Sequence, residues 1–263
     1  LGFHHPVWIE DPAFDLDHHV RRVAAPAPGG SRELDRVISD IASVPVDRGR
    51  PLWEIWFVEG LAGGRVAAVG KIHHTVADGI AVAGLLANVM APGMTGLAEA
   101  ELATPWSPEH VPSPARLLRD ALADHGRQLV RLPALLRRTA RNLRAVARWR
   151  REAALSPPRP IRDAPRTSLN GSLTARRAFA STALSLDDTR RVRNAFGVSS
   201  NDVLLAMVAG TLRTYFAERG EHPAGPLIAE VPVATDAPGT RRLGGNHLSN
   251  IFMKLQLANR IQA

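Results

Sequence analysis

The feature that most constrains the fold is a polar segment, from His73 to Gly79, that separates two apolar stretches of different character. The stretch before it, Arg65 to Ile72, has the length and the β-branched content of a buried strand, and the stretch after it, Ile80 to Met90, has helical character. The segment reads HHxxxDG, so an imidazole at a strand end is followed by a carboxylate four residues later. This arrangement suits a general base that deprotonates a hydroxyl or a thiol, and it favours an acyl-transfer enzyme.

Composition excludes several other classes. The chain has 263 residues, which can bury one large core or two modest ones, and no cysteine. A disulfide framework, a thiolate metal site and a cysteine nucleophile are therefore excluded. No apolar run reaches the length of a membrane span. Because the chain begins at Leu1 within an aromatic-rich segment and ends at Ala263 shortly after an apolar run, we expect it to be an internal piece of a longer protein.

The formal charge of +8 is concentrated in one segment. Between Ser113 and Ala153 there are eleven arginines and three acidic residues, so this segment accounts for the whole excess and a general nucleic-acid binder is not indicated. Leucines between the arginines predict one or two long helices over residues 115–155, interrupted near Pro133. Two interpretations stay open: a solvated helix face, or peripheral contact with anionic lipid.

The rest of the chain alternates helices and strands. Gly60 to Gly64 joins two predicted strands, which indicates a hairpin with the histidines at its far end. Gly197 is expected to end one helix, and Ser199 or Ser200 to cap the next. Proline-rich stretches interrupt the pattern at residues 91–114 and 157–165. Helices are predicted over 31–44, 80–90, 187–196 and 201–218, and strands over 52–59, 65–72, 179–186, 227–233 and 247–257.

Five short segments follow one another in a characteristic order. They are Pro51-Leu52-Trp53-Glu54, His73 to Gly79, Asn170-Gly171-Ser172 followed by Arg176-Arg177, Asn201-Asp202, and Gly245-Asn246 followed by Ser249-Asn250. In order and spacing they resemble the PLW, HHxxxDG, NG, ND and GN…SN motifs of the bacterial wax ester synthase/diacylglycerol acyltransferase family. The chain departs from the family pattern after Gly171, where relatives often carry another glycine, and at His247, where a glutamine is usual.

The resemblance implies an α/β fold with mixed α+β sheets. Its two lobes would resemble those of chloramphenicol acetyltransferase and the condensation domains, with the active site in a tunnel between them, and the fold would be incomplete at both ends. Residues 1–95 would be the remainder of the N-terminal lobe that carries HHxxxDG. Residues 96–166 would form a proline-bounded basic helical connection, and residues 167–263 the truncated start of the second lobe.

The resemblance also implies an acyl-CoA-dependent O-acyltransferase. It would move a fatty acyl group from acyl-CoA to a long-chain alcohol or a diacylglycerol, giving wax ester or triacylglycerol. Acyl-CoA is then a substrate, and we expect no cofactor and no nucleic-acid partner. The expected location is cytoplasmic, with peripheral contact at the inner membrane face or at lipid droplets. Two alternatives stay open: a condensation-type acyltransferase with carrier-bound acyl donors, and a non-catalytic lipid- or membrane-binding protein.

Different roles are expected within the HHxxxDG segment. The resemblance implies that His74 is the general base, and we expect His73 to orient the loop. Asp78 would pair with an arginine elsewhere and hold the shape of the loop, and Gly79 would permit close backbone packing at the helix start. The alternative is purely structural: a pair of turn histidines before a helix that Asp78 caps.

Four further residues are candidates for substrate binding. Asn201 would face the tunnel and help to place the acyl carbonyl, but Asn201 and Asp202 are equally suited to capping a helix. Asn246 is expected to be a loop or turn residue and is a candidate for a role at the site. Trp53 is a candidate contact for substrate, although a large aromatic at a strand position is more typical of a core.

The two parts of an acyl-CoA need different surroundings. The acyl chains are apolar, so the tunnel is expected to be lined by residues such as Leu85, Val203 and Met207. The CoA phosphates need positive charge at the tunnel mouth, and Arg176, Arg177 or the arginines of the basic helices are candidates.

A metal site is a further interpretation of the histidines. His74 and Asp78 could face one ion if both lay on a helix, with added ligands from His4, His5, His18 and His19. However, the three residues between His74 and Asp78 follow a strand end and are more typical of a loop, and no HExxH arrangement is present. We therefore expect no metal.

Overall fold

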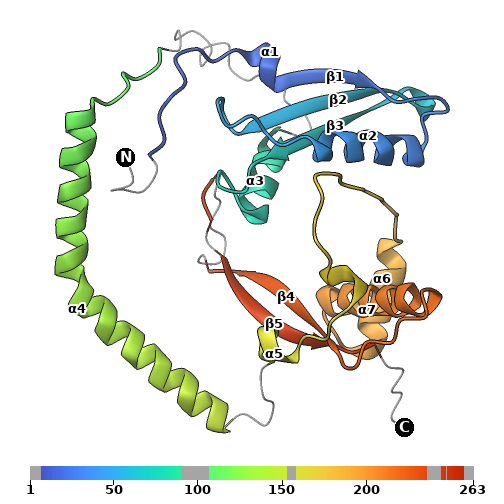
Figure 1. The fold of residues 1–263 in the computed structure, drawn as a ribbon. Helices are drawn as coiled ribbons and strands as arrows, with labels where there is room; N and C mark the ends of the chain where they lie inside the picture. The colour runs from blue at the N-terminus through green and yellow to red at the C-terminus, as the bar shows by residue number, and fades with distance from the viewer. Residues whose placement is uncertain (1–6, 90–106, 153–157, 236–243, 247, 258–263) are drawn as a thin grey trace. The chain divides into compact units, whose positions relative to one another are not determined.

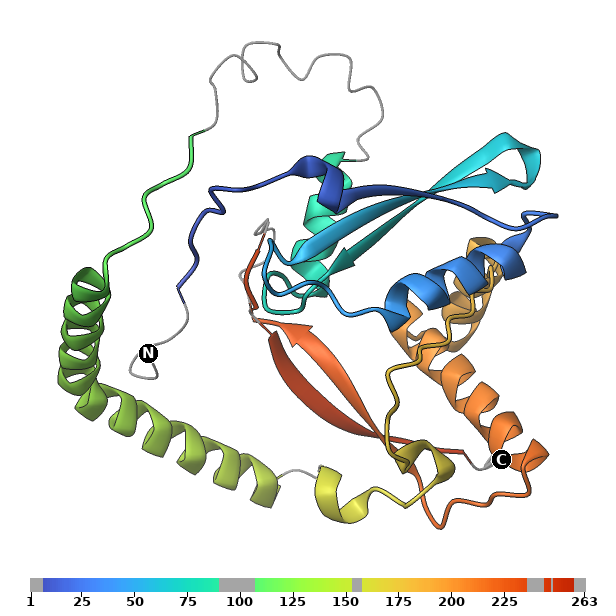
Figure 2. The same ribbon diagram turned by 45° about the horizontal axis from the view of Figure 1, so that its top comes forward.

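The computed structural model describes most of the chain. The described ranges are 7–89, 107–152, 158–235, 244–246 and 248–257. The chain divides into two compact units. The first consists of Leu1–Phe14 and Gly93–Ser156, and the second of Asp15–Pro92 and Pro157–Ala263. Each unit is considered by itself. The second contains both β-sheets and the HHxxxDG segment (Figures 1 and 2).

The first sheet has three strands in the order β1-β2-β3. β2 (Trp53–Leu61) and β3 (Arg65–Ile72) are antiparallel and are joined by one turn of 3-10 helix, Ala62–Gly64, which confirms the predicted hairpin. β1 (Val20–Ala24) pairs in parallel with β2 and follows the short helix α1 (Leu16–His19). We did not predict β1, because its five residues include two arginines and lack an apolar strand pattern.

Helix α2 (Ser31–Ser43) packs against this sheet, as Figure 1 shows. A core cluster joins Val37 and Ile41 of α2 to Val58 and Leu61 of β2. The chain enters α2 through a close backbone contact, in which the Ala62 N–H donates to the carbonyl oxygen of Gly29 over 2.8 Å. Gly29 has φ +75, and a Cβ there would lie 2.2 Å from the carbonyl oxygen of Gly60, so only glycine fits. The beginning of α2 is thereby held at the hairpin turn.

The later part of the second unit consists of helices followed by a two-stranded sheet. α6 (Leu186–Phe196) ends at Gly197, whose φ of 63 is the left-handed conformation expected of a C-cap glycine. α7 (Ser200–Glu218) is capped by Ser199, as the sequence predicts. The antiparallel strands are β4 (Leu227–Ala234) and β5 (Leu248–Leu255). The minor elements are α5 (Pro160–Asp163) and a 3-10 turn at Ser168–Asn170.

The strand predicted over 179–186 is wrong. Among the described residues this segment pairs with no strand, and α6 already begins at Leu186. The backbone N–H of Phe179 donates to Ser39 Oγ over 2.8 Å, and that of Ser181 to an Asp35 carboxylate oxygen over 3.0 Å. Side chains of α2 thus supply the acceptors that a neighbouring strand would otherwise provide, which is why an extended segment exists here outside any sheet.

In the first unit, α4 (Pro114–Glu152) is one continuous helix of 39 residues. Pro133 does not interrupt it as predicted; Figure 1 shows that the helix instead changes direction near its middle. Proline lacks an N–H and crowds the preceding turn, and a bend relieves that clash. The leucines of α4 are largely exposed, Leu122 by 66%, Leu129 by 69% and Leu143 by 65%.

Within the described ranges, no single helix is both long enough and apolar enough to cross a bilayer. α6 and α7 together satisfy the length and composition, but their axes are bent by 102° at the short break between them.

Candidate functional site

The HHxxxDG segment forms a tight turn at the end of the three-stranded sheet. His73 follows β3, and its backbone N–H donates to the carbonyl oxygen of Leu52 over 2.9 Å, which continues the pairing with the β2 side. The chain then turns, with the N–H of Val76 donating to the His73 carbonyl oxygen over 2.9 Å. Helix α3 (Gly79–Val89) begins directly after the turn. The strand–turn–helix arrangement predicted around the motif is confirmed.

The His73 ring is held within the turn. Its Nδ1 accepts a hydrogen bond from the backbone N–H of Thr75 over 3.2 Å and lies 2.8 Å from the Thr75 hydroxyl oxygen. A backbone N–H can only donate, so His73 Nδ1 is the acceptor in this contact. These contacts lie within the turn, and the loop-orienting role expected for His73 stays a prediction.

His74 differs from His73 in having an exposed side chain. Within the part of the chain that the structure describes, no hydrogen bond or ion pair involves its imidazole. Its backbone, by contrast, is held: the carbonyl oxygen of His74 accepts a hydrogen bond of 2.8 Å from the side-chain amide of Asn246. The backbone of His74 is therefore held while its ring is exposed.

The segment around Gly245 pairs with the turn along its length. The Gly245 N–H donates to the carbonyl oxygen of Val76 over 2.8 Å, and the Asp78 N–H donates to the carbonyl oxygen of Gly245 over 3.1 Å. Gly245 and Ala77 form a parallel β-bridge. The structure thus brings the GN motif and the HHxxxDG motif together. Sequence reasoning missed this contact because neither motif contains a pattern that indicates which distant segment it pairs with.

Asp78 is fully buried and caps α3. Its side chain accepts a hydrogen bond from the Ala81 N–H over 3.0 Å, and its carbonyl oxygen accepts one from Val82 over 2.9 Å. The capping role weighed from the sequence is therefore present, and the arginine partner of Asp78 stays a prediction. A Cβ at Gly79 would meet no heavy atom of a described residue outside its own helix within 4 Å, and the close packing predicted there stays a prediction.

Trp53 lies at the same end of the sheet, where it pairs with Ile72 of β3. His19, which is only 3% exposed, stacks on the indole with 4.5 Å between ring centroids. The His19 Nδ1–H donates to the carbonyl oxygen of Trp53 over 2.7 Å. Sequence reasoning did not place His19 here, because this contact follows from the parallel pairing of β1 with β2. Trp53 contributes to packing at this end, and its role in binding substrate stays a prediction.

Asn201 and Asp202 lie in the first turn of α7. Asp202 forms a capping box with Ser199, accepting from its hydroxyl over 2.6 Å and from its backbone N–H over 2.9 Å. These hydrogen bonds hold the pKa of the Asp202 carboxyl below its usual value of 3.8. Asn201 is exposed. No hydrogen bond among the described residues joins either of them to the HHxxxDG turn, so their substrate role stays a prediction.

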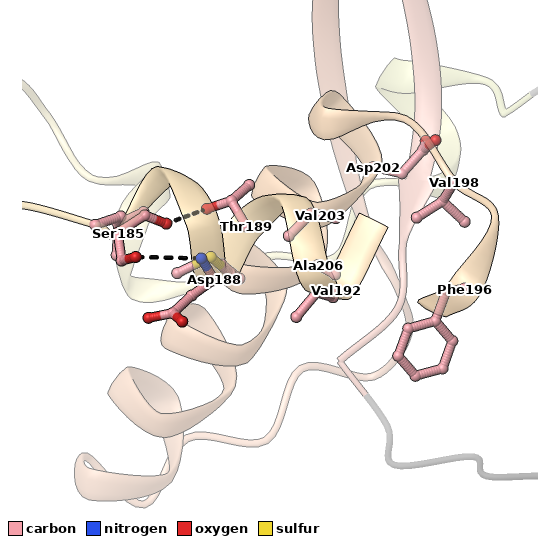
Figure 3. A pocket seen from close by; sticks show the side chains of 11 residues that line it. Ser185, Asp188, Thr189, Val192, Phe196, Val198, Asp202, Val203 and Ala206 are labelled. Carbon is pink, nitrogen blue, oxygen red and sulfur yellow. Dashed lines mark hydrogen bonds between the residues drawn. The ribbon is translucent and has the colours of Figure 1, made fainter. Parts of the chain in front are cut away.

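An apolar pocket of about 750 Å³ lies between α6 and α7 (Figure 3). Val203 and Met207, two of the residues expected to line a tunnel, lie on its wall together with Asp202. Leu85 of α3, the third, does not line it. At one end of the pocket, Ser185 caps α6: its side-chain hydroxyl accepts a hydrogen bond from the Asp188 N–H over 3.1 Å.

The metal interpretation finds no support in the described ranges, where no group of three or more histidine or acidic side chains could hold an ion. His4 and His5 lie outside those ranges.

Comparison with known proteins places the chain in a family. The model of the wax ester synthase/diacylglycerol acyltransferase catalytic domain matches residues 1–204. This chain is 42% and 40% identical to two Mycobacterium tuberculosis H37Rv proteins, Rv0221 and Rv3087. Both are named as candidate diacylglycerol O-acyltransferases. The alignments cover 97% of this chain and 53% and 54% of those proteins, so the chain spans about half the length of these relatives.

A solved structure agrees with this assignment. The wax ester synthase/diacylglycerol acyltransferase from Marinobacter aquaeolei VT8 matches with a TM-score of 0.58 and 29% identity, over 89% of this chain and 50% of that one. The mixed α/β fold expected from the sequence is confirmed. The chain belongs to the wax ester synthase/diacylglycerol acyltransferase family.

Proposed function

We propose that the protein is an acyl-CoA-dependent O-acyltransferase that acts on a long-chain alcohol or a diacylglycerol, giving wax ester or triacylglycerol. Family membership supports acyl transfer, and the names of the mycobacterial relatives support diacylglycerol as an acceptor. The observation that carries the proposal is the His73–Gly79 turn. Hydrogen bonds to Leu52 and Asn246 hold its backbone, while the His74 imidazole stays exposed.

His74 acts as the general base in this proposal. Its ring takes the proton of the acceptor hydroxyl as the oxygen attacks the thioester carbonyl carbon. The tetrahedral intermediate then collapses, the C–S bond breaks, and the imidazolium returns the proton to the departing sulfur. The products are an ester and free CoA thiol. Direct transfer requires no covalent enzyme intermediate, because a thiolate is already a good leaving group.

The hydrogen bonds around the turn hold the backbone of His74 in place. Asn246 binds its carbonyl oxygen, and Asp78 caps the helix that follows. Effective proton transfer needs the base within hydrogen-bond reach of the hydroxyl, and a turn fixed before substrate arrives avoids ordering it during the reaction. We therefore assign Asn246 and Asp78 as positioning residues.

The test uses the full-length protein with palmitoyl-CoA and either hexadecanol or dioleoylglycerol. Free CoA thiol and ester product are measured together. We expect equal amounts of both, with the preferred acceptor identified by rate. Turnover with a carrier-bound acyl donor but none with palmitoyl-CoA would replace the proposal by the condensation-type alternative. No product from either donor would favour the non-catalytic lipid-binding alternative.

We also propose that α4 contacts an anionic lipid surface. This surface is either the inner face of the membrane or a lipid droplet. The helix displays exposed leucines along 39 residues whose segment carries eleven arginines. Apolar side chains that insert between headgroups and arginines that meet lipid phosphates suit such an interface.

Vesicle sedimentation of the full-length protein tests this contact. We expect binding to vesicles that contain phosphatidylglycerol, weaker binding to pure phosphatidylcholine, and a loss of binding when Leu122, Leu129 and Leu143 are replaced by serine. Equal binding of this variant and the wild type would exclude α4 as the contact.

A further inference from the structure

A second cavity lies between the polar face of α2 and the extended segment around residue 177, and has a volume of about 540 Å³. We call it the α2 groove. Its charged lining consists of Arg32, Arg36, Arg176, Arg177, Asp35 and Asp40. Four arginines and two aspartates give the lining a net charge of +2 if all six are ionised.

A ladder of hydrogen bonds builds the groove. The backbone N–H groups of Arg177, Phe179 and Ser181 each donate to a side chain of α2, over 2.8, 2.8 and 3.0 Å. The acceptors are, in the same order, Ser43, Ser39 and Asp35. Two residues of extended chain advance about 6.6 Å, and four residues of helix about 6 Å, so the two repeats match. The segment therefore lies antiparallel to α2 with its position along the helix defined.

The positive charge in the groove is not neutralised internally. Both Asp35 oxygens accept hydrogen bonds from Ser181, to its N–H over 3.0 Å and to its hydroxyl over 2.7 Å. Among the described residues, no carboxylate forms an ion pair with Arg32, Arg36 or Arg176. Guanidinium groups in one cavity repel each other, and a multivalent anion relieves that repulsion while accepting bidentate hydrogen bonds.

The Arg177 end of the groove lies toward the end of the sheet that carries the histidines. Because the beginning of α2 is held at the hairpin turn, its C-terminal end lies toward the opposite end of β2. In agreement, Ile41 and Val44 line one cavity together with Glu54 and Lys71. Lys71 directly precedes Ile72 and the HHxxxDG turn. Arg177 meets α2 at that same C-terminal end.

We propose that the α2 groove binds the phosphates of the acyl donor's nucleotide, with Arg32, Arg36 and Arg176 as the contacting cations. The inference rests on the proposed acyl-CoA donor. It assigns the phosphate-bearing end of that donor to the α2 groove. With the phosphates in the groove, the pantetheine arm extends toward the turn that carries His74. Arg177, whose guanidinium already donates to the carbonyl oxygens of Thr174 and Arg176, shapes the wall.

The test compares two double variants of the full-length protein. Arg32→Gln with Arg36→Gln removes two exposed guanidiniums from the groove and leaves the ladder and the apolar face of α2 intact. Arg22→Gln with Arg190→Gln removes the same charge from surface ion pairs outside the groove. We expect the groove variant to bind adenosine 3′,5′-bisphosphate about tenfold more weakly and the control variant to bind it like the wild type.

Kinetics separate this proposal from the proposed function. In the groove variant KM for palmitoyl-CoA should rise about tenfold, while kcat and KM for hexadecanol stay unchanged. Turnover with palmitoyl-CoA at an unchanged KM would overturn the groove and leave the acyltransferase intact. If no variant turns over, the titration with adenosine 3′,5′-bisphosphate still decides: equal affinities in both variants overturn the groove, and selective weakening supports it.

A lipid headgroup offers the same phosphate chemistry, so its binding is measured in parallel. Sedimentation with phosphatidylglycerol vesicles should be equal for the two double variants. Selective loss of vesicle binding in the groove variant, with unchanged affinity for adenosine 3′,5′-bisphosphate, would overturn the nucleotide assignment.

Discussion

The side-chain amide of Asn246 donates a hydrogen bond of 2.8 Å to the backbone carbonyl oxygen of His74, although 172 residues separate the two. The neighbouring Gly245 bridges Ala77 in the same turn. Two motifs that stand far apart in the chain therefore form one structural unit, and the backbone that carries the proposed base depends on the later motif for its position.

Replacing Asn246 by alanine tests this dependence. The exposed hydrogen bond contributes about 1 kcal/mol to stability, so we expect a small fall in Tm. The effect on kcat should be larger, about tenfold, because the orientation of His74 is relaxed. Asn194→Ala, which removes an amide from the surface of α6, is the matched control. An unchanged kcat in Asn246→Ala would show that the contact does not position the base.

The two adjacent histidines should respond differently to alanine. His74→Ala removes the proposed base, and we expect kcat to fall by about a hundredfold to ten-thousandfold without a change in Tm. His73→Ala removes the acceptor of the Thr75 N–H, so Tm should fall and kcat should decrease less than in His74→Ala. Circular dichroism melting and turnover with palmitoyl-CoA measure both. A larger kcat loss in His73→Ala would reverse the assignment.

Asp78 should matter for stability through the cap of α3. Asp78→Ala removes the acceptor for the Ala81 N–H at a fully buried position, and loss of a cap costs about 1–2 kcal/mol. Asp78→Asn keeps a side-chain oxygen and should retain part of the cap. We expect urea unfolding of the full-length protein to order the stabilities as wild type, then Asp78→Asn, then Asp78→Ala. Equal stability of all three would rule out the cap as a stabilising feature.

Two aspartates of α2 provide a matched pair for the ladder. Asp35 accepts two hydrogen bonds from Ser181, whereas Asp40 is exposed and its side chain makes no hydrogen bond among the described residues. Asp35→Ala should therefore lower the free energy of unfolding by about 1–2 kcal/mol, and Asp40→Ala by much less. Chemical denaturation of the two variants decides. Similar losses would mean that the ladder does not contribute to stability.

The capping box of α7 predicts a dependence on pH. The pKa of Asp202 is lowered by hydrogen bonds from the Ser199 hydroxyl and backbone, so the folded state favours the carboxylate. The stability that it contributes is present above the usual pKa of 3.8 and is lost as pH falls through the lowered pKa of the folded protein. NMR titration should show that Ser199→Ala raises the pKa of Asp202 toward 3.8, whereas Ser200→Ala leaves it unchanged. No rise in Ser199→Ala would contradict the box.

Local signals predicted much of the fold. β3, bounded by Arg65 and Ile72, coincides with the predicted strand, and α2 ends within one residue of the prediction. Gly197 and Ser199 act as the expected helix end and helix cap. Each of these features depends on residues within a few positions of one another. The local sequence pattern therefore contains the residues that cause the structure.

The misses share a different cause. β1 is a strand because it pairs with β2, and its own residues do not require that conformation. The segment from Phe179 to Leu186 has the alternation of a strand, yet the N–H groups of Phe179 and Ser181 bind side chains of α2. In both cases the segment that supplies the hydrogen-bond partners is distant in the chain. Hydrophobic periodicity indicates which face of a segment is apolar, but it does not indicate which other segment pairs with it.

The sequence by itself determined the family, the strand–turn–helix arrangement at His73 to Gly79, and the candidate base His74. Only the tertiary structure decided that Asn246 holds the His74 backbone and that Arg32, Arg36 and Arg176 line one groove. The physical reason is that a motif specifies its own local hydrogen bonds, whereas contacts between distant segments depend on packing that buries both at once.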